Sequence, residues 1–152
     1  MVTRDQANTL ATGIKAAEVY NATTKLCSSY AWDTALNFIQ NRVSNYGTTS
    51  PQGNYKDTTF SYTDITGATQ TKSLGSDALI PTGETSPICN IYDMGGNDWE
   101  WTTEASSVSG FPCVYRGGGY DGYYSSCPAG YRYCFTTAGS FYSVGFRATL
   151  YM

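Results

Sequence analysis

Helical spacing of apolar residues dominates the first third of the chain. Thr3 followed by Gln6 matches the capping-box pattern, in which each side chain satisfies a free main-chain N–H at the start of a helix. An alanine-rich run follows, so we predict a first helix that extends to about Ala17. A second helix is predicted from apolar residues at i, i+3, i+4 and i+7 spacing, namely Trp32, Ala35, Leu36, Ile39 and Val43. Its expected stop is the turn-forming sequence Asn45-Tyr46-Gly47.

From Thr48 to about Ser86 the chain is polar and is interrupted by glycine and proline. We predict loops there, with a short hairpin over residues 58–65 and 68–73. The C-terminal half has no helical period, and its short segments between glycine clusters predict strands of an antiparallel sheet: Cys89–Met94, Asp98–Thr103, Cys113–Arg116 and Val144–Tyr151. Helices followed by strands indicate an α+β fold, and we expect residues 1–152 to form a single domain.

Charge and hydropathy exclude two classes of partner. The chain carries a net charge of −3 and no lysine follows Lys72, so it lacks the clustered basic residues of a nucleic-acid-binding surface. Its longest apolar runs are a few residues, far short of the ~20 needed to cross a bilayer. No charged and apolar leader opens the chain. We therefore expect a soluble domain that binds no nucleic acid and does not insert into a membrane.

The residue types available for chemistry are equally restrictive. The chain contains no histidine, which excludes Ser-His-Asp and Cys-His nucleophile systems and histidine zinc sites. Five cysteines form no Cys-x-x-Cys pair, and their odd number leaves at least one thiol unpaired. Buried free thiols, one disulfide, and a metal-binding or catalytic thiol are three open interpretations for Cys27, Cys89, Cys113, Cys127 and Cys134.

Three motifs in the C-terminal half have a specific physical meaning. They are NIYDMGGNDWEWT at residues 90–102, YRGGGY at residues 115–120 and VGFR at residues 144–147. Gly95-Gly96-Asn97 predicts a turn with positive φ. Trp99 and Trp101 lie two apart on a strand and so point to one face as core anchors, whereas Glu100 points to the other.

Two arginines in these motifs are candidate scaffold residues. We expect Arg116 and Arg147 to form buried bidentate pairs with acids such as Asp93, Asp98 or Glu100. The glycines that follow Arg116 would allow a close approach of the backbone beside a strand. Direct contact of the arginines and tryptophans with a ligand is the alternative interpretation.

In order and spacing, the three motifs resemble the family of the formylglycine-generating enzyme over about residues 88–150. The helix that contains Tyr30-Ala31-Trp32-Asp33 is similar to the family more weakly. The resemblance implies the C-type lectin-like fold of that family, with two N-terminal helices, a small antiparallel sheet and long loops.

The catalytic residues of the family do not carry over. Its copper(I) enzymes need two cysteines shortly after the Gly-Gly, because two thiolates suit this soft ion. Counted from Gly117 without gaps, the two positions hold Gly122 and Cys127, so half of the pair is missing. The iron-dependent branch of the family uses histidine ligands, which this chain lacks. We therefore expect no catalytic residue, no metal and no cofactor.

Residues 119–146, which we call the Tyr-rich segment, lie between the second and third motifs. Tyr, Ser and Gly dominate the segment, and its charged residues are Asp121 and Arg132. This is the composition of antibody paratopes, in which Tyr supplies contact area at low entropy cost. The expected binding residues are Gly119, Asp121, Gly122, Tyr123, Tyr124, Ser126, Tyr131, Tyr133, Phe135, Phe141 and Tyr142.

The Tyr-rich segment also lacks Lys, Glu, Gln, Met and Trp, the five amino acids that codons ending in C cannot encode. These five occupy 17 of the 118 residues before it, so their absence from 28 residues is unusual. Diversity-generating retroelements, which mutate adenines of AAC-type codons, would leave such a gap. They act on proteins of this fold between an RGG-like and a GFR-like motif. The chain resembles such a variable protein, with Pro128, Ala129 and Arg132 as fixed scaffold positions.

The predicted function is non-catalytic ligand binding by a receptor-type or adhesin-type module on a phage or cell surface, with a protein or glycan partner on a target. We expect Tyr123, Tyr124, Tyr131 and Tyr133 to be exposed and to cluster on one face. A lectin-like module with one fixed ligand is the alternative, and a copper oxidase is a weaker one. A calcium-dependent lectin is disfavoured, because the nearby acids form no tight run of carboxylate and carbonyl ligands: Asp98, Glu100, Glu104 and Asp121.

Overall fold

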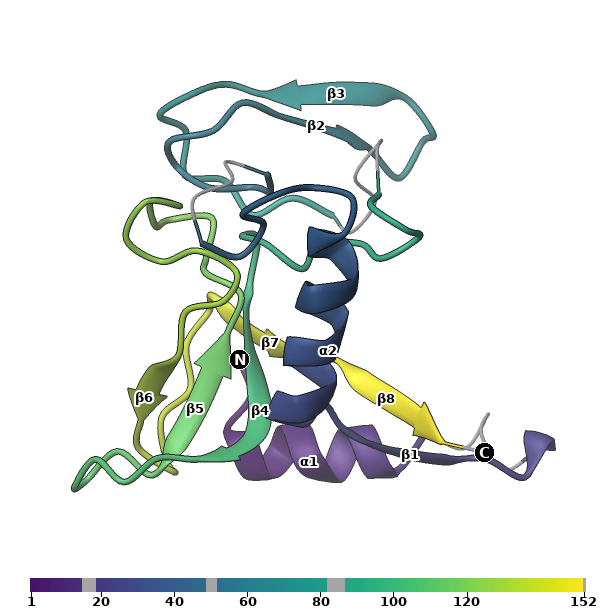
Figure 1. Ribbon diagram of the computed structural model, residues 1–152, viewed down its shortest axis with the longest axis vertical. Helices are drawn as coiled ribbons and strands as arrows, with labels where there is room; N and C mark the ends of the chain where they lie inside the picture. The colour runs from purple at the N-terminus through teal and green to yellow at the C-terminus, as the bar shows by residue number, and fades with distance from the viewer. Residues whose placement is uncertain (15–18, 49–51, 82–86, 152) are drawn as a thin grey trace.

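The computed structural model describes residues 1–14, 19–48, 52–81 and 87–151. Its described part contains helices α1 (Arg4–Thr12) and α2 (Ser29–Gln40) and three small sheets. In Figure 1, α1 lies along the base of the four-stranded sheet and α2 rises beside it, while a separate hairpin covers the opposite end. No helix in these ranges is long and apolar enough to cross a membrane.

Helix α1 begins as predicted. Thr3 accepts a hydrogen bond from the Gln6 N–H, and the Gln6 side chain accepts one from the Thr3 N–H. The helix ends at Thr12 rather than Ala17, because the Gly13 N–H turns back to the carbonyl groups of Thr9 and Leu10. Ala17 itself lies outside the described residues. The helix contributes Ala7 and Ala11 to the core, where small side chains allow close contact with the sheet.

Helix α2 carries the predicted apolar stripe, since Trp32, Leu36 and Ile39 are buried. Ser28 caps its first turn by accepting a hydrogen bond from the Ala31 N–H. The helix ends at Gln40, one turn earlier than the expected stop. Irregular turns follow through Asn45 and Gly47, which both have positive φ, at 62° and 87°.

The four-stranded sheet has the order β6-β5-β4-β7. Its strands are β4 (Trp99–Ala105), β5 (Cys113–Arg116), β6 (Tyr133–Phe135) and β7 (Val144–Phe146). Antiparallel pairing joins β4 to β5 and β5 to β6, but β4 and β7 pair in parallel. The expected all-antiparallel sheet is therefore wrong at β7, because the Tyr-rich segment crosses over before it returns to the sheet.

Two of the other predicted strands differ from the structure. The segment predicted as one strand over Val144–Tyr151 divides at Arg147 into β7 and β8 (Ala148–Tyr151), and β8 pairs with β1 (Thr23–Leu26) in a separate antiparallel sheet. The segment Cys89–Met94 is not a strand, because Cys89, Asn90 and Asp93 have positive φ. The predicted hairpin is present as β2 (Phe60–Thr63) and β3 (Thr69–Lys72).

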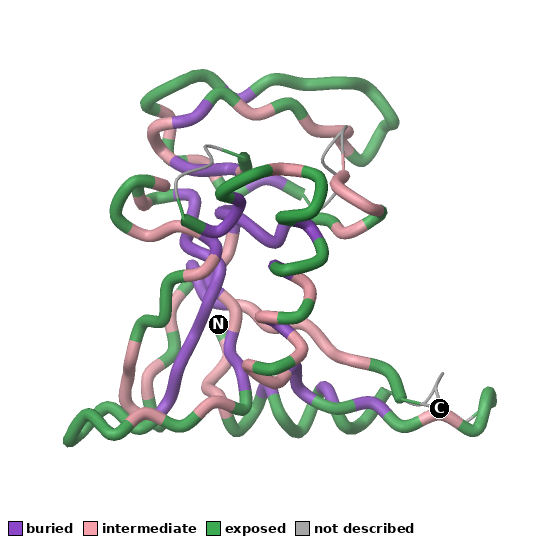
Figure 2. Tube along the Cα trace, viewed as in Figure 1, coloured by how far each residue is buried: buried purple, intermediate pink, exposed green. Residues whose placement is uncertain are grey.

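Buried residues form two apolar clusters, and each contains at least one residue of the three motifs. Trp99, Trp101 and Tyr115 pack with Leu26 and the buried alanines of α1 in the first cluster. Trp32 and Leu36 pack with Met94 and Ala129 in the second, under α2. Figure 2 shows the buried trace concentrated along the central strands and in the loops directly above them. The motifs therefore build the core that supports the Tyr-rich segment.

Candidate ligand-binding surface

The tryptophans of the first motif have the predicted scaffold position. Trp99 and Trp101 point to one face of β4 and both contact the ring of Tyr115 edge-on, with ring centroids 5.0 and 5.1 Å apart. The Trp101 indole N–H donates to the carbonyl of Val2 at 3.0 Å. The predicted turn before these residues is present, with φ of 70° at Gly96 and 63° at Asn97.

Glu100 points to the opposite face, as predicted, and pairs with Arg147. The Arg147 guanidinium donates through Nη2 to Oε1 at 2.7 Å and through Nε to Oε2 at 2.5 Å. Its Cζ also lies 5.3 Å from the centre of the Trp32 ring. Burial raises the pKa of Glu100, and the Arg147 charge acts in the opposite direction. This pair joins the third motif to the first beneath α2.

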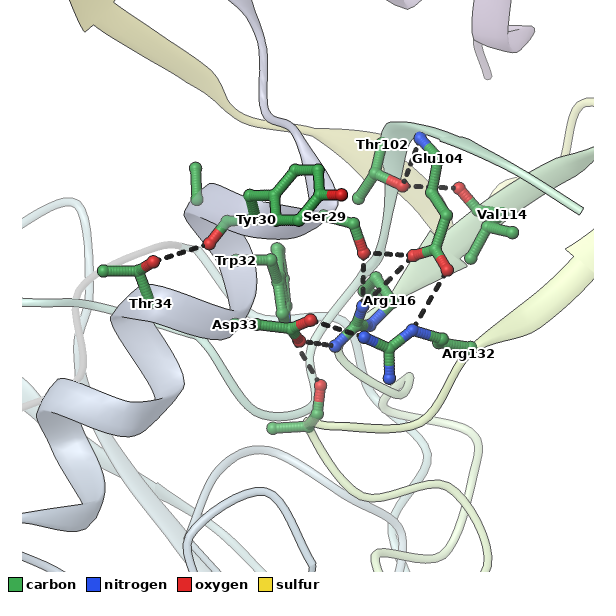
Figure 3. A network of polar contacts seen from close by, with 12 residues as sticks. Ser29, Tyr30, Trp32, Asp33, Thr34, Thr102, Glu104, Val114, Arg116 and Arg132 are labelled. Carbon is green, nitrogen blue, oxygen red and sulfur yellow. Dashed lines mark hydrogen bonds and ion pairs between the residues drawn. The ribbon is translucent and has the colours of Figure 1, made fainter.

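Arg116 is fully buried but has different partners from those expected. It donates to Asp33 of α2 at 2.6 Å and to Glu104 of β4 at 3.3 Å, rather than to the acids of the first motif. The same two carboxylates also bind Arg132, at 2.5 and 3.0 Å (Figure 3). Ser29 completes the network by donating to Glu104 and accepting from Arg116. The network ties α2, the sheet and the Tyr-rich segment together.

Residues outside the Tyr-rich segment hold its first loop by hydrogen bonds to main-chain atoms of that loop. The Lys56 N–H donates to the carbonyl of Gly122 at 2.8 Å, and the Tyr120 N–H donates to the carbonyl of Asn97 at 2.7 Å. The Asp57 carboxylate accepts a hydrogen bond from the Tyr124 N–H at 2.9 Å. Because these bonds reach the backbone, they do not depend on the side chains of the segment.

The centre of the segment is anchored in the same way. The Trp32 indole N–H donates to the carbonyl of Ala129 at 3.1 Å, and Ala129 is buried. The Gly130 N–H donates to the carbonyl of Gly47 at 2.9 Å. With the ion pairs of Arg132, these bonds fix the middle of the segment against α2 and the turn that follows it.

The ring contacts of the segment's aromatic side chains fall into two groups, which we call the sheet region and the loop region. In the sheet region, the rings of Tyr131 and Tyr133 lie 6.2 Å apart, and both contact Trp99 edge-on. Phe135 and Phe141 continue this region, with ring centroids 4.8 Å apart. Tyr131 and Tyr133 are exposed, as predicted, while the two phenylalanines are half-buried.

The loop region consists of Asp121, Gly122, Tyr123, Tyr124 and Ser126. Tyr123 is exposed, whereas Tyr124 is half-buried and contacts Tyr55 edge-on at 6.4 Å. Among the described residues, no ring contact joins Tyr123 or Tyr124 to the sheet region. Asp121 and Ser126 are exposed. Tyr142, outside both regions, is also exposed, but Gly119 is buried and cannot be part of a displayed surface.

The structure also adds two residues that the sequence did not indicate. A groove of about 320 Å³ runs beside β6, and Val108 and Phe111 of the β4–β5 connection form its far wall. Both side chains are exposed, and the ring of Phe111 lies 6.2 Å from that of Phe135. Two apolar residues in an otherwise Ser- and Gly-rich connection were the available signal.

The positions that bind copper in the family's enzymes hold no pair of thiols here. Gly122 is in the loop region, and Cys127 is half-buried, where burial raises the pKa of its thiol. All five cysteines are free thiols, and Cys27 and Cys113 are buried. In the described part of the chain, no group of three Cys, Asp or Glu side chains is placed to hold a metal ion.

The two helices, the mixed sheet and the motif tryptophans define an elaborated C-type lectin-like domain. The family model for the sulfatase-modifying factor enzyme 1-like domain matches residues 8–150. The chain therefore belongs to the family of sulfatase-modifying factor and formylglycine-generating enzymes. A search of curated proteins found no match.

Two solved structures support the same fold. The crystal structure of CarF has a TM-score of 0.65 at 17% identity, and the match covers 98% of this chain and 65% of that protein. Treponema denticola variable protein 1 has a TM-score of 0.58 at 18% identity, and the match covers 83% of this chain and 47% of that protein. The chain thus spans less than two thirds of either protein.

Proposed function

We propose that this domain is a non-catalytic ligand-binding module of receptor or adhesin type, with the Tyr-rich segment as its binding surface. One observation carries the proposal. Residues outside the segment form hydrogen bonds to main-chain atoms of the segment, while most of its tyrosines are exposed. Side chains on such a surface can change without loss of the loop conformation, because exposed substitutions usually alter stability by no more than about 0.5 kcal/mol.

We further propose that a diversity-generating retroelement has varied this segment. The absence of Lys, Glu, Gln, Met and Trp from its 28 residues supports this origin. The fold likeness to a protein named as a variable protein agrees with it. The anchoring of Ala129 and Arg132 agrees with their assignment as fixed positions inside the segment.

The copper chemistry of the family is not expected from this chain. A lone thiolate at Cys127 cannot supply two-coordinate copper(I), and its burial disfavours the thiolate form. Titration with copper(I), followed by an assay for oxidation of a cysteine-containing peptide, tests this part of the proposal. We expect neither stoichiometric binding nor turnover, and the observation of both would assign the domain to the enzymes.

The surrounding DNA provides the sharpest test of diversification. We expect a reverse-transcriptase gene nearby and a near-copy of the codons for residues 119–146 that differs mainly at adenines. If both are missing, a lectin-like module with one fixed ligand becomes the better assignment. For a diversified module and for a module with one fixed ligand alike, the proposed partner is a protein or glycan on a target surface. The proposed place of display is outside the host cytoplasm, on a phage tail or a cell surface.

A further inference from the structure

The Tyr-rich segment presents one charge that has no partner. Its cation, Arg132, is engaged by Asp33 and Glu104. Asp121 is exposed, and within the part of the chain that the structure describes it forms no hydrogen bond or ion pair. Asp121 therefore has no ion pair of its own, and the nearby Lys56 pairs with Asp77 instead.

This carboxylate lies at the edge of the aromatic surface. A side chain built on the buried Gly119 would meet both the Asp121 Oδ1 atom and the Trp99 indole at 2.8 Å, so the two are neighbours across this glycine. The same indole contacts Tyr131 at 6.3 Å and Tyr133 at 5.9 Å between ring centroids. Asp121 therefore stands next to the ring that supports the exposed tyrosines of the sheet region.

A second carboxylate strengthens the negative potential at this edge. The Oδ1 atom of Asp98 is buried and has no hydrogen-bond partner in the described structure. Burial raises the pKa of Asp98, and the charge of Asp121 raises it further. Burial is the main cause of the raised pKa of the Tyr115 and Tyr120 phenols, and the charge of Asp121 adds to it. The same charge adds to the raised pKa of the Lys56 amine, so Asp121 acts on groups on several sides of it.

We propose that the surface of this chain recognises a protein ligand through one of its lysine or arginine side chains, with Asp121 as the residue that determines this specificity. The inference rests on the proposed function and names the ligand class for the same surface. A cation beside Asp121 gains a charge-assisted hydrogen bond, and nearby tyrosine faces attract the cation through their π electrons. Anionic partners such as sulfated glycans are repelled by the same charges.

Selection from a displayed library of random peptides tests the proposal without a known ligand. Peptides are selected on the wild-type domain, and their dissociation constants are then measured for wild type, Asp121→Asn and Asp5→Asn. The Asp5→Asn variant is the matched control, because it removes the same charge from an exposed position on α1. We expect selected peptides to be enriched in lysine and arginine, with affinity about tenfold lower for Asp121→Asn and unchanged for Asp5→Asn.

Two further variants separate this inference from the proposed function. Tyr131→Ala and Tyr142→Ala remove exposed rings from the surface, and thermal unfolding checks that each variant is folded. If selected peptides lose affinity for these variants but are neutral or acidic and bind Asp121→Asn normally, the cationic ligand class is wrong and the binding surface stands. If no selected peptide responds to Asp121→Asn or to either tyrosine substitution, both proposals are overturned.

Discussion

The carboxylate of Asp57 accepts the main-chain N–H of Tyr124 at 2.9 Å, so a residue outside the Tyr-rich segment fixes the backbone of its first loop. We predict that Asp57→Ala raises the hydrogen-exchange rate of the Tyr124 amide by about 10- to 150-fold, since a hydrogen bond to a charged group contributes about 1.5–3 kcal/mol. Tyr124→Ser is the matched variant, because it changes the side chain and keeps the amide. Protection of residue 124 in that variant should match wild type, and a loss equal to that of Asp57→Ala would contradict backbone anchoring.

The ion-pair network has one critical carboxylate. Asp33→Ala leaves the fully buried Arg116 with Glu104 as its remaining counterion, and the loss of this charge-assisted hydrogen bond should lower the free energy of unfolding by about 1.5–3 kcal/mol. Arg132→Ala removes a guanidinium that is 46% exposed and should lower it by no more than about 1 kcal/mol. Urea denaturation measures both values. Equal losses for the two variants would mean that the exposed pairs stabilise the fold as much as the buried one.

Asp64 makes the hairpin sensitive to acid. Hydrogen bonds from Thr66 and Gln70 lower the pKa of its carboxyl from 3.8 to about 2. The stabilisation by the ionised carboxylate is complete above the unfolded value and is lost as the pH falls from 3.8 towards 2. Amide exchange at Ala68, which donates to the same carboxylate, should accelerate over this range. Asp64→Asn should remove this pH dependence, and an unchanged profile in that variant would assign it to another group.

The pKa of Asp98 is shifted in the opposite direction from that of Asp64, so its effect on stability has the opposite pH dependence. Its raised pKa means that the folded state holds this proton more tightly than the unfolded chain, so protonation of Asp98 stabilises the fold as the pH falls through the raised value. Asp121→Asn should lower the pKa of Asp98, because it removes the second cause of the shift. Carboxyl carbon NMR titration measures this change directly. A pKa of Asp98 that does not move would show that the two carboxylates do not interact.

Gly118 and Gly75 have similar φ angles but different surroundings, so substitutions there separate steric crowding from backbone strain. Gly118 has φ of 77°, and a Cβ there would lie 2.2 Å from the carbonyl oxygen of Cys127. Gly118→Ala should therefore cost about 2–4 kcal/mol of stability. Gly75 has φ of 85° with open space around it, so Gly75→Ala should cost only about 1 kcal/mol. A similar cost at both positions, measured by thermal unfolding, would show that the close approach at Gly118 is relieved by movement.

Local signals predicted the parts of the fold that depend on neighbours in the sequence. The capping box of α1, the stripe of α2 and the direction of Glu100, opposite to Trp99 and Trp101, each follow from spacing along one element. Strand β6 was missed, because three residues in a Tyr-rich stretch show no alternation. The parallel pairing of β7 was missed because it depends on a crossover rather than on local sequence.

For the proposed binding surface, the sequence predicted the composition but not the arrangement. Exposure of Tyr131 and Tyr133 follows from the paratope-like sequence, whereas the burial of Gly119 follows from its contact with Trp99. The partner of Arg116 could not be chosen from sequence, because Asp33 lies 83 residues away and comes near only when α2 packs on the sheet. Val108 and Phe111 join the groove beside β6 for a similar reason.

The anchoring of Ala129 has a consequence for the size of a ligand. Its carbonyl, held by the Trp32 indole, lies between the loop region and Tyr131 in the sequence, so changes of exposed side chains on either side leave this anchor in place. A small glycan that touches one region encounters only the substitutions made there. Under the proposed diversification, a protein large enough to cover both regions encounters every combination of the two sets, so the proposed repertoire multiplies only for ligands with a broad footprint.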